Sequence, residues 1–403
     1  MTGLRTEDHI ARPVGLRALA FATLVLCSAF GEASTGLLVP AMPMMGEVFR
    51  AGPATVQLAI VAFAAAFAVG QLVFGPLSDR RGRRAALLIG AALALAGSLA
   101  AALAGDLWII IAARSVQGLG AAAGYVTARA IVRDVYGAEG AAGAMALLFA
   151  LMSACFLLAP LAGGLLQDFG GWRAGFAAAA LAAMAWLLSA LMILPETGTK
   201  RAGQEVEAAH RVYLGLFRHR EFLVNMAVHA IGYAGLYCFV AGAPFLLIEG
   251  RGLAPSGYGA LAALAMSGFL AGAMTARVAI PRWGRTRTIS VSLAIMLAAP
   301  AALLGAGVLG LDSTPAITAL QFAVWFGGGL LAPNTAAGVM MAHPNAAGAA
   351  AAALGFVQML AAAAAALIQG LIYDGTVFPV AGLQLLLSMT AWIVWRRSLS
   401  VRR

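Results

Sequence analysis

The sequence has little charge and few of the side chains from which enzymes build active sites and metal centres. Only 10% of its 403 residues are charged and 62% are hydrophobic, which leaves too little polar surface to cover a soluble protein. Its five histidines are scattered, and it contains no G-x-S-x-G, no phosphate-binding loop and no H-E-x-x-H zinc motif. We therefore predict a protein that is not an enzyme, binds no cofactor or metal, and draws its energy from a gradient.

The composition also argues against a disulfide framework and against nucleic acid as a partner. Cys27, Cys155 and Cys238 all lie inside apolar runs. The net charge of +10 comes from arginines in short clusters between apolar stretches of about 20 residues, the length needed to cross a bilayer. The first apolar run is too long for a signal peptide and lacks a small-residue cleavage site, so we expect it to be retained.

Twelve apolar stretches predict twelve membrane-spanning helices. The expected spans lie near residues 17–39, 55–77, 85–105, 108–129, 143–167, 173–194, 222–247, 258–280, 288–310, 315–341, 347–373 and 378–396. The sequence thus predicts an all-α integral membrane protein with two six-helix bundles, residues 1–194 and residues 222–403. A polar, cytoplasmic linker over residues 195–221 joins them, and its amphipathic part, residues 205–217, is expected to lie on the membrane surface as a short helix.

The arginines indicate how the chain is oriented. With the N-terminus inside, the expected outer loops contain only Arg50, Arg173 and Arg251, whereas the inner segments contain many more arginines. This asymmetry matches the positive-inside rule, so both termini are predicted to be cytoplasmic.

The segment between the second and third expected spans carries a specific motif. It reads Gly75-Pro-Leu-Ser-Asp79-Arg80-Arg-Gly82-Arg83-Arg-Ala-Ala, with glycines where the backbone can turn tightly and arginines that cannot enter hydrocarbon. This segment resembles the loop between spans 2 and 3 of the major facilitator superfamily. The resemblance implies that Gly75, Asp79, Arg80, Gly82 and Arg83 act as a conformational latch, holding one conformation of a transporter through contacts on its cytoplasmic side.

The two halves look like a degenerate repeat. Residues 281–285, Pro-Arg-Trp-Gly-Arg, follow the eighth span at the place that residues 79–83 hold after the second, but the aspartate is missing from this copy. Parallel halves of this kind rock against each other around a central site.

Further motifs narrow the resemblance to a branch of the superfamily. Residues 114–120 match the R-x-x-Q-G-x-G of span 4 in proton-linked members, and residues 159–164 resemble the G-P-x-x-G-G of span 5 in exporters. The chain is thus similar to drug:proton antiporters of the Bcr/CflA type. The resemblance implies that Pro160, Gly163 and Gly164 shape a bend in span 5.

That resemblance also implies a function. We expect a secondary active multidrug efflux transporter of the bacterial cytoplasmic (inner) membrane that exchanges protons for a small amphiphilic drug such as chloramphenicol or bicyclomycin. Its expected partners are the small-molecule substrate, protons and the lipid bilayer, with no nucleic acid, and it is expected to be a monomer. One departure concerns the aspartate that this branch carries in span 1, because Gly36 holds that position here and a carboxylate appears one turn earlier, at Glu32.

Glu32 and Arg114 are the only acidic and basic residues placed away from the ends of the expected spans. A charged side chain at the bilayer centre costs about 2.5–3.5 kcal/mol on insertion scales, so both need a reason to be there. Helical rise puts both at about the same depth, roughly 9–12 Å below the outer surface. We predict that they lie close enough to pair, directly or through water, and that they couple transport to protons. The alternative is a structural ion pair that locks spans 1 and 4.

Polar and aromatic residues inside the spans are the predicted lining of a substrate cavity. Asn225, His229, Tyr233 and Tyr237 recur at intervals of four on one face of span 7, where His229 adds a second titratable group. Hydrogen bonding between helices is the alternative role for this face. The full set of cavity candidates is Gln57, Gln117, Tyr125, Asn225, His229, Tyr233, Tyr237, Trp325, Asn334 and Gln358. A cavity with so few polar groups suits amphiphilic compounds.

Two other functions fit the same sequence. The first is a proton-linked exporter or importer of a metabolite, such as a sugar or amino-acid derivative. The second is a membrane receptor or scaffold with a transporter fold and no transport. A flux assay separates them, because a scaffold gives no pH-dependent flux.

Overall fold

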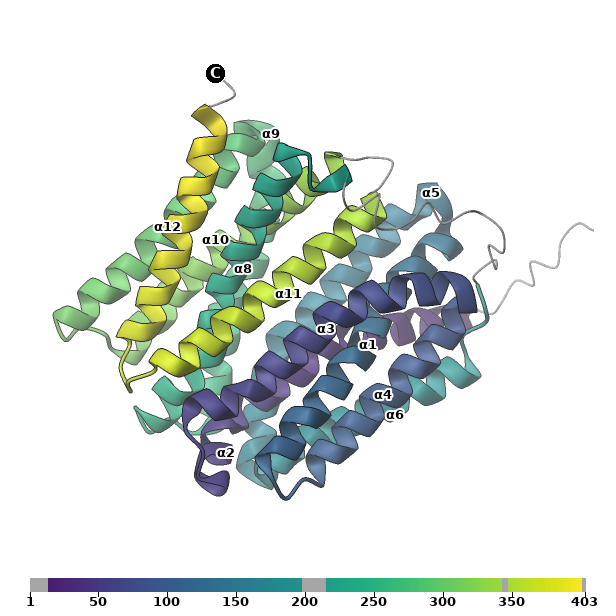
Figure 1. The fold of residues 1–403 in the computed structure, drawn as a ribbon, viewed down its shortest axis with the longest axis horizontal. Helices are drawn as coiled ribbons and strands as arrows, with labels where there is room; N and C mark the ends of the chain where they lie inside the picture. The colour runs from purple at the N-terminus through teal and green to yellow at the C-terminus, as the bar shows by residue number, and fades with distance from the viewer. Residues whose placement is uncertain (1–13, 198–214, 343–346, 401–403) are drawn as a thin grey trace, which may run out of the picture.

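The computed structural model describes residues 14–197, 215–342 and 347–400, which form helices and contain no strand (Figure 1). The expected surface helix over residues 205–217 lies almost wholly outside these ranges. The helices are α1 (Val14–Leu38), η1 (Val39–Ala41), α2 (Met42–Phe49), α3 (Pro53–Arg81), α4 (Arg83–Ala102), α5 (Leu107–Gly170), α6 (Trp172–Met192), α8 (Arg220–Pro244), η2 (Phe245–Glu249), α9 (Pro255–Val308), α10 (Thr314–Met341), α11 (Ala347–Ile372) and α12 (Phe378–Ser400).

Eleven helical segments of the described chain are long and apolar enough to cross a membrane. One of them, α9, contains 54 residues, which at 1.5 Å per residue extend over about 80 Å, more than twice the hydrocarbon thickness. It bends at Gly284, where φ is +73°, and therefore makes two passes. The longer α5 bends in the same way at Gly137. The all-α membrane fold with twelve spans is confirmed.

The helix that contains the fourth expected span extends beyond that span. The fourth span was expected to end near residue 129, but the helix continues to the bend at Gly137. Within this helix the Arg129 guanidinium lies 3.5 Å from the centre of the Tyr125 ring. An arginine that stacks on an aromatic ring keeps its charge in contact with the protein while the helix continues toward water.

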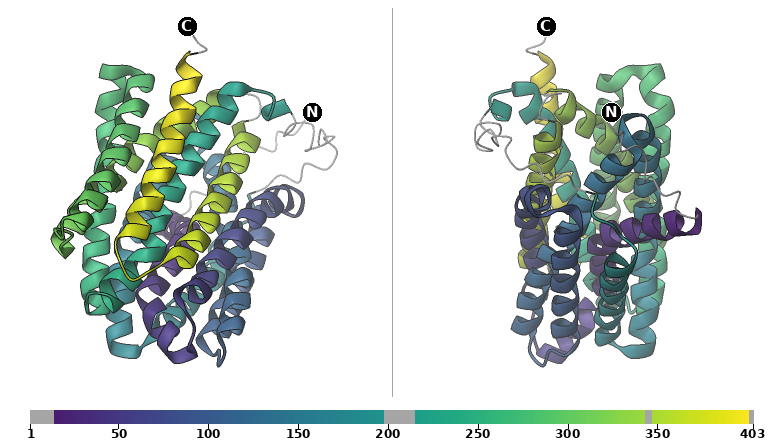
Figure 2. Two further views of the ribbon diagram at one scale, coloured as in Figure 1. Left: turned by 60° about the vertical axis from the view of Figure 1, so that its left-hand side comes forward. Right: turned by 90° about the vertical axis from the view of Figure 1, so that its right-hand side faces the viewer.

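The helices pack in two groups. The N-terminal group contains α1, α3, α4, α5 and α6, and the C-terminal group contains α8 to α12. The groups meet along two seams, one between α3 and α11 and the other between α5 and α9. Figure 1 shows α11 lying beside α3, and Figure 2 shows the two groups from the side.

One end of the molecule, which we call the closed end, is sealed by contacts between the groups. The backbones of α5 and α9 approach so closely that a Cβ at Gly164 would lie 2.2 Å from the carbonyl oxygen of Pro255. Next to this contact, the backbone N–H of Ser256 donates to the Asp168 carboxylate at 3.2 Å. The Gln57 side chain in turn donates to the carbonyl oxygen of Ala241 at 3.0 Å. These contacts join residues that are far apart in sequence and belong to different groups.

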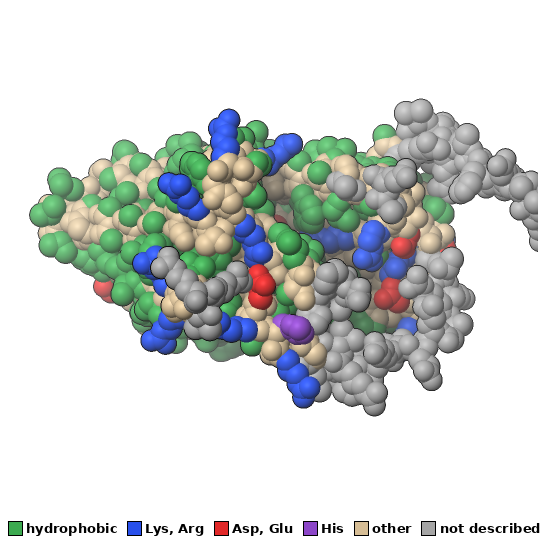
Figure 3. Space-filling view, turned by 90° about the horizontal axis from the view of Figure 1, so that it is seen from above, with side chains coloured by type: hydrophobic (Ala, Val, Ile, Leu, Met, Phe, Trp, Pro, Cys, Tyr) green, Lys and Arg blue, Asp and Glu red, His purple; other side chains and the backbone are tan. Residues whose placement is uncertain are grey.

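The opposite end, which we call the arginine end, differs. Here Arg83 bonds to Asp79 and Asp134 of its own group, and Arg285 bonds to Asn225 and Asn334 of the other. Figure 3 looks down on this end, where charged side chains lie around a hollow between the two groups.

Candidate functional site

Glu32 lies in the middle of α1 and contacts the other group of helices. The Tyr233 hydroxyl on α8 donates a hydrogen bond to its carboxylate at 3.2 Å, across 201 residues of sequence. The Tyr233 ring also lies against Tyr237, with the two ring centres 5.3 Å apart. The carboxylate is therefore part of the boundary between the groups, at a place where its charge state can affect how they pack.

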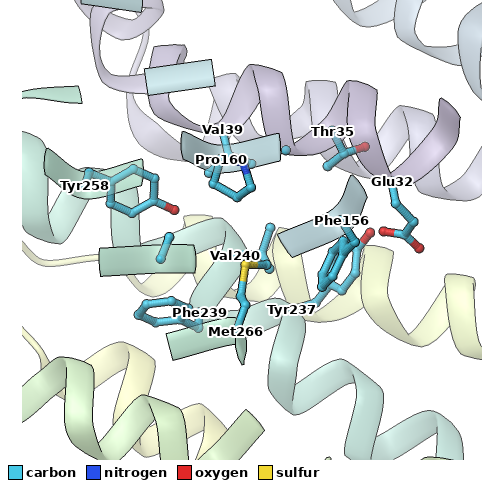
Figure 4. Close-up of a pocket in the computed structure, with 12 residues that line it drawn as sticks. Glu32, Thr35, Val39, Phe156, Pro160, Tyr237, Phe239, Val240, Tyr258 and Met266 are labelled. Carbon is cyan, nitrogen blue, oxygen red and sulfur yellow. The ribbon is translucent and has the colours of Figure 1, made fainter. Parts of the chain in front are cut away.

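A pocket opens beside Glu32 on the side of the closed end. Its lining residues come from α1, η1, α5, α8 and α9, and they are Glu32, Thr35, Gly36, Val39, Phe156, Pro160, Tyr237, Phe239, Val240, Tyr258, Ala262 and Met266. Glu32 is the one charged side chain among these twelve residues. Figure 4 shows its carboxylate at one end of this space and the Tyr258 ring at the other, with Pro160, Val240 and Met266 between them.

The packing of α1 on α5 leaves no room for a side chain at position 36. A Cβ at position 36 would lie 2.5 Å from the Cβ of Ala159, closer than real side chains pack. The packing of α1 on α5 therefore excludes any side chain at Gly36. Glu32, one turn away, is instead only partly buried and reaches the pocket.

Arg114 is fully buried. Among the described residues it forms no ion pair with Glu32, so the prediction of a direct ion pair is wrong. Its guanidinium donates to the backbone carbonyl of Ala59 at 3.3 Å, to the Thr35 hydroxyl at 3.0 Å and to the Gln117 side chain, and it lies 4.1 Å from the centre of the Phe63 ring. The reason is geometric, because these neutral acceptors surround it. Thr35 lines the pocket beside Glu32, so the arginine is linked to the pocket wall through that hydroxyl.

The four residues predicted to share one face of α8 do not all lie at the same site. His229 and Tyr233 line a second pocket, together with Gly232, Leu236, Phe269, Gly328, Leu331 and Ala332. Tyr237 lines the first pocket. Asn225 lies nearer the arginine end, where it donates to the Glu221 carbonyl and accepts from Arg285. The structure thus brings Glu32, Tyr233 and Tyr237 together and leaves Asn225 apart from them.

The other predicted cavity residues line neither of these two pockets, although Gln358 contacts His229, which lines the second. The amide oxygen of Gln358 lies 3.0 Å from Nε2 of His229. The remaining five are buried or half-buried in contacts between helices. Those contacts are Gln57 to the Ala241 carbonyl, Gln117 to Ser98 and Arg114, Tyr125 to Phe67 and Arg129, Trp325 to Phe156 and Phe269, and Asn334 to the Leu330 carbonyl and Arg285.

Several pocket residues were missed by the sequence. Phe156, Phe239, Val240 and Met266 are apolar residues within apolar spans, and nothing distinguishes them from residues that face lipid. Tyr258 offered a signal, since a tyrosine hydroxyl inside an apolar span needs a partner or a cavity.

The loop between α3 and α4 is held together by Arg83. Its guanidinium bonds to Asp79, to Asp134 at 2.9 Å and to the Ser78 hydroxyl at 2.8 Å. At Gly82 the backbone has φ of +101°, which favours glycine. The Glu196 carboxylate accepts hydrogen bonds from the backbone N–H groups of Arg83 and Arg84 at the start of α4. Gly75 is half-buried and Arg80 is exposed.

Comparison with known families gives a match over most of the chain. The model of the Major Facilitator Superfamily matches residues 24–366. Multidrug resistance protein D of Escherichia coli (strain K12) is 30% identical over 340 residues, 83% of this chain and 84% of that protein. A chloramphenicol resistance protein of Pseudomonas aeruginosa is 31% identical over 283 residues, 69% of this chain and 66% of that protein. An uncharacterized MFS-type transporter of Bacillus subtilis (strain 168) is 30% identical over 248 residues, 60% of this chain and 62% of that protein, so these last two matches span less than two thirds of the relatives' length.

Among solved structures, a D-xylose-proton symporter superposes with a TM-score of 0.77 at 15% identity, covering 93% of this chain and 97% of that chain. A POT family transporter in complex with a peptide conjugate superposes with a TM-score of 0.75 at 14% identity, covering 97% and 96%. At these identities the likeness concerns the fold.

Proposed function

This chain belongs to the Major Facilitator Superfamily, and from that premise we propose that it exports small amphiphilic drugs in exchange for protons. It is a multi-pass membrane transporter and not an enzyme. The drug:proton exchange, the membrane and the residues that carry the exchange are the proposal.

One observation carries it, namely that the lone charged group of the pocket also contacts the opposite group of helices. Glu32 lines the pocket and accepts a hydrogen bond from Tyr233 on α8. A carboxylate exposed to a substrate pocket can either bind a proton or interact with the substrate. If the substrate displaces the proton from the carboxylate, and the proton in turn displaces the substrate, the protein exchanges substrate for proton, which is antiport. Arg114 belongs to the same site through Thr35.

The pocket's chemistry supports an amphiphilic substrate. Apolar and aromatic side chains form most of its wall, and the Tyr237 and Tyr258 side chains, Thr35 and Glu32 supply the few polar groups. Such walls bind drug-sized molecules through apolar area and orient them through a small number of hydrogen bonds. Two relatives carry names that refer to chloramphenicol or multidrug resistance. Chloramphenicol, a neutral aromatic compound with hydroxyl groups, is therefore the substrate we would test first.

We also propose the sidedness. Positive residues favour the cytoplasmic side, which assigns the arginine end and both termini to the cytoplasm of a bacterial inner membrane. The pocket is then sealed from the outside by the contacts of Asp168, Ser256, Gly164 and Gln57, and transport requires these contacts to separate. Residues 1–194 and 222–403 would move as two units connected by the linker 195–221, within a monomer.

The test uses purified protein in liposomes with an acidic interior. The wild type is expected to accumulate chloramphenicol in the lumen, and Glu32→Gln to insert normally but to lose accumulation. Glu47→Gln, which removes an exposed carboxylate from α2, is the matched control and should behave as the wild type does. Full accumulation by Glu32→Gln would contradict the proposal.

The choice of substrate is tested in cells. An efflux-deficient bacterium that expresses the chain is expected to survive higher concentrations of chloramphenicol or of another amphiphilic antibiotic. Flux of sugar or amino-acid derivatives without any drug resistance would favour a metabolite transporter, and the absence of any pH-dependent flux would favour a scaffold.

A further inference from the structure

The hydrogen bonds around His229 determine where its protons lie. Nδ1 of His229 is 2.8 Å from the Thr335 hydroxyl oxygen. That hydroxyl has a single proton, which it donates to the carbonyl oxygens of Leu331 and Ala332, at 3.0 and 3.2 Å. When the hydroxyl proton is used for these carbonyls, the hydroxyl oxygen accepts from the ring and Nδ1 carries a hydrogen.

The other ring nitrogen, Nε2, faces an amide that can either accept a hydrogen bond from it or donate one to it. Nε2 of His229 lies 3.0 Å from the side-chain amide of Gln358 on α11. With the amide oxygen toward the ring, Nε2 is a donor and the imidazole is doubly protonated. With the amide turned over, its NH₂ donates to an unprotonated Nε2, and the heavy atoms keep the same positions. The ring can thus gain or lose a proton without losing a hydrogen bond.

A tyrosine links this ring to the carboxylate of the first pocket. Tyr233 donates to Glu32, which lines the first pocket, and Tyr233 and His229 both line the second pocket, one helical turn apart. The Tyr233 hydroxyl therefore lies between the carboxylate and the space that adjoins the histidine. Both Tyr233 and Gln358 are only partly buried, which leaves their polar groups within reach of water.

We propose that His229 is a second proton-binding site, which exchanges protons with Glu32 through the Tyr233 hydroxyl and water in the second pocket. This inference rests on the proposed function, in which Glu32 binds the transported proton. In the transfer, protonated Glu32 gives its proton to the Tyr233 oxygen while Tyr233 gives its own proton to water. The water then gives a proton to Nε2 of His229. Glu32 ends as a carboxylate and His229 as an imidazolium, while Tyr233 stays neutral.

The surrounding charges favour this transfer in one respect and oppose it in another. The groups facing the ring from α10 and α11 are the neutral Thr335 and Gln358, and α9 contributes Phe269 to the shared pocket. The transfer leaves opposite charges on the two sides of Tyr233, which attract each other. Arg285 reaches α8 at Asn225, one turn before His229, and its charge repels an imidazolium. The attraction by the Glu32 carboxylate and the repulsion by Arg285 act on His229 from opposite directions along α8.

The direction of the transfer agrees with export of the drug. The chain of α8 runs from Arg220 at the arginine end toward the closed end. His229 precedes Tyr233 by four residues, so it lies about 6 Å nearer the arginine end. In the proposed orientation, a proton that reaches Glu32 from outside moves toward the cytoplasm when it passes to His229.

The protonation of His229 can be observed directly. The full chain is prepared with ¹⁵N-labelled histidine after the other four histidines, at positions 9, 210, 219 and 343, are replaced by glutamine. As the pH is lowered from 9 to 5, both ring nitrogens are expected to move to the resonance positions of an imidazolium. A ring that stays neutral over this whole range would overturn the proposal, whatever the transport activity.

The role of Tyr233 is tested by comparing two kinds of transport in the same liposomes. Drug accumulation driven by a pH gradient requires proton movement, whereas exchange of labelled for unlabelled drug does not. We expect Tyr233→Phe and His229→Gln to reduce the first at least tenfold more than the second. Equal reduction of both would indicate a structural role only. If both variants keep full proton-driven transport while Glu32→Gln loses it, the relay is wrong and the proposed function stands.

Discussion

The two halves build the same turn but bind its arginine differently. Gly82 and Gly284 both have positive φ, +101° and +73°, and each is followed by an arginine that bonds to neighbouring helices. In the N-terminal half the partners of Arg83 are the carboxylates of Asp79 and Asp134 and the Ser78 hydroxyl. In the C-terminal half Arg285 bonds to a backbone carbonyl at Asn334 and to the Asn225 amide, with the Glu221 carboxylate at 4.0 Å.

The difference shows which feature of the repeat both halves need. The glycine turn and the arginine are common to both, so they serve the connection between two antiparallel spans. Among the described residues, the carboxylates of Asp79 and Asp134 lie within 2.9 Å of the Arg83 guanidinium, and Pro281 stands in the C-terminal half at the position equivalent to Asp79. We infer that charge pairing at the N-terminal turn has a task beyond holding the turn, such as favouring one conformation of the transporter.

The largest expected effect comes from substituting the turn glycines. Alanine at either position is strained by a positive φ, at a cost of about 1–3 kcal/mol. At Gly82 the new Cβ would also lie 2.3 Å from the Glu196 carboxylate, whereas at Gly284 it meets open space. Gly82→Ala should therefore lower the thermal unfolding temperature of the purified protein more than Gly284→Ala. Equal losses would show that Glu196 adjusts freely.

The arginines come next. Arg83→Ala leaves two carboxylates without their partner and should destabilise the protein by about 2 kcal/mol, since hydrogen bonds to charged groups are worth about 1.5–3 kcal/mol and this cluster is partly exposed. Arg285→Ala removes the bonds to the Asn334 carbonyl and the Asn225 amide, and the loss of these two neutral acceptors should cost about 1 kcal/mol. Unfolding measured in high salt separates the two variants further. Salt should weaken the ion pairs of Arg83 in the wild type more than the contacts of Arg285, so it should reduce the loss of stability caused by Arg83→Ala more than the loss caused by Arg285→Ala. An equal salt effect on both variants would contradict the assignment of charge to one half.

A smaller effect is expected from the two carboxylates, and it separates stability from transport. The Asp79 side chain is 65% exposed and that of Asp134 is 28% exposed, so Asp134→Asn should destabilise the protein more, with Asp79→Asn costing about 0.5 kcal/mol or less. If Asp79 favours one conformation, Asp79→Asn should reduce turnover in liposomes more than it reduces drug binding. Unchanged turnover would show that the loop only fixes the topology of the chain in the membrane.

The smallest expected effect comes from adding a carboxylate next to Arg285 in the C-terminal half. Asn225→Asp places a carboxylate where the Asn225 amide oxygen accepts from Arg285, at a position that is almost fully buried. The ionised pair should strengthen the contact with Arg285, and the loss of the Asn225 donor to the Glu221 carbonyl should weaken the site, so the unfolding temperature should change only slightly. The matched control is Asn334→Asp, since the Asn334 contact to Arg285 is made by its backbone carbonyl. Stabilisation by both substitutions would point to net charge and not to the local pair.

The sequence predicted the fold well because membrane spans follow from composition. Apolar runs and the placement of arginines are local signals, and they do not show that the helix continues past Arg129 to Gly137, with the Arg129 guanidinium on the Tyr125 ring. Glu32 could be found because an acid inside an apolar run is conspicuous.

Contacts between distant residues were beyond the sequence. The bond between Glu32 and Tyr233 joins two groups of helices, and the apolar pocket residues differ from lipid-facing ones only by position. A direct ion pair between Glu32 and Arg114 is not among those of the described residues, because equal depth does not fix direction, and neutral acceptors such as Thr35 and the Ala59 carbonyl surround the guanidinium. The pairing through water stays a prediction.

The central claim is that Glu32 exchanges a proton for the drug, and proton release on drug binding tests it most directly. Purified protein in weakly buffered detergent is mixed with chloramphenicol, and a pH indicator records the protons released. The account predicts release by the wild type and by Glu47→Gln, and none by Glu32→Gln that still binds the drug. Undiminished release by Glu32→Gln would contradict it.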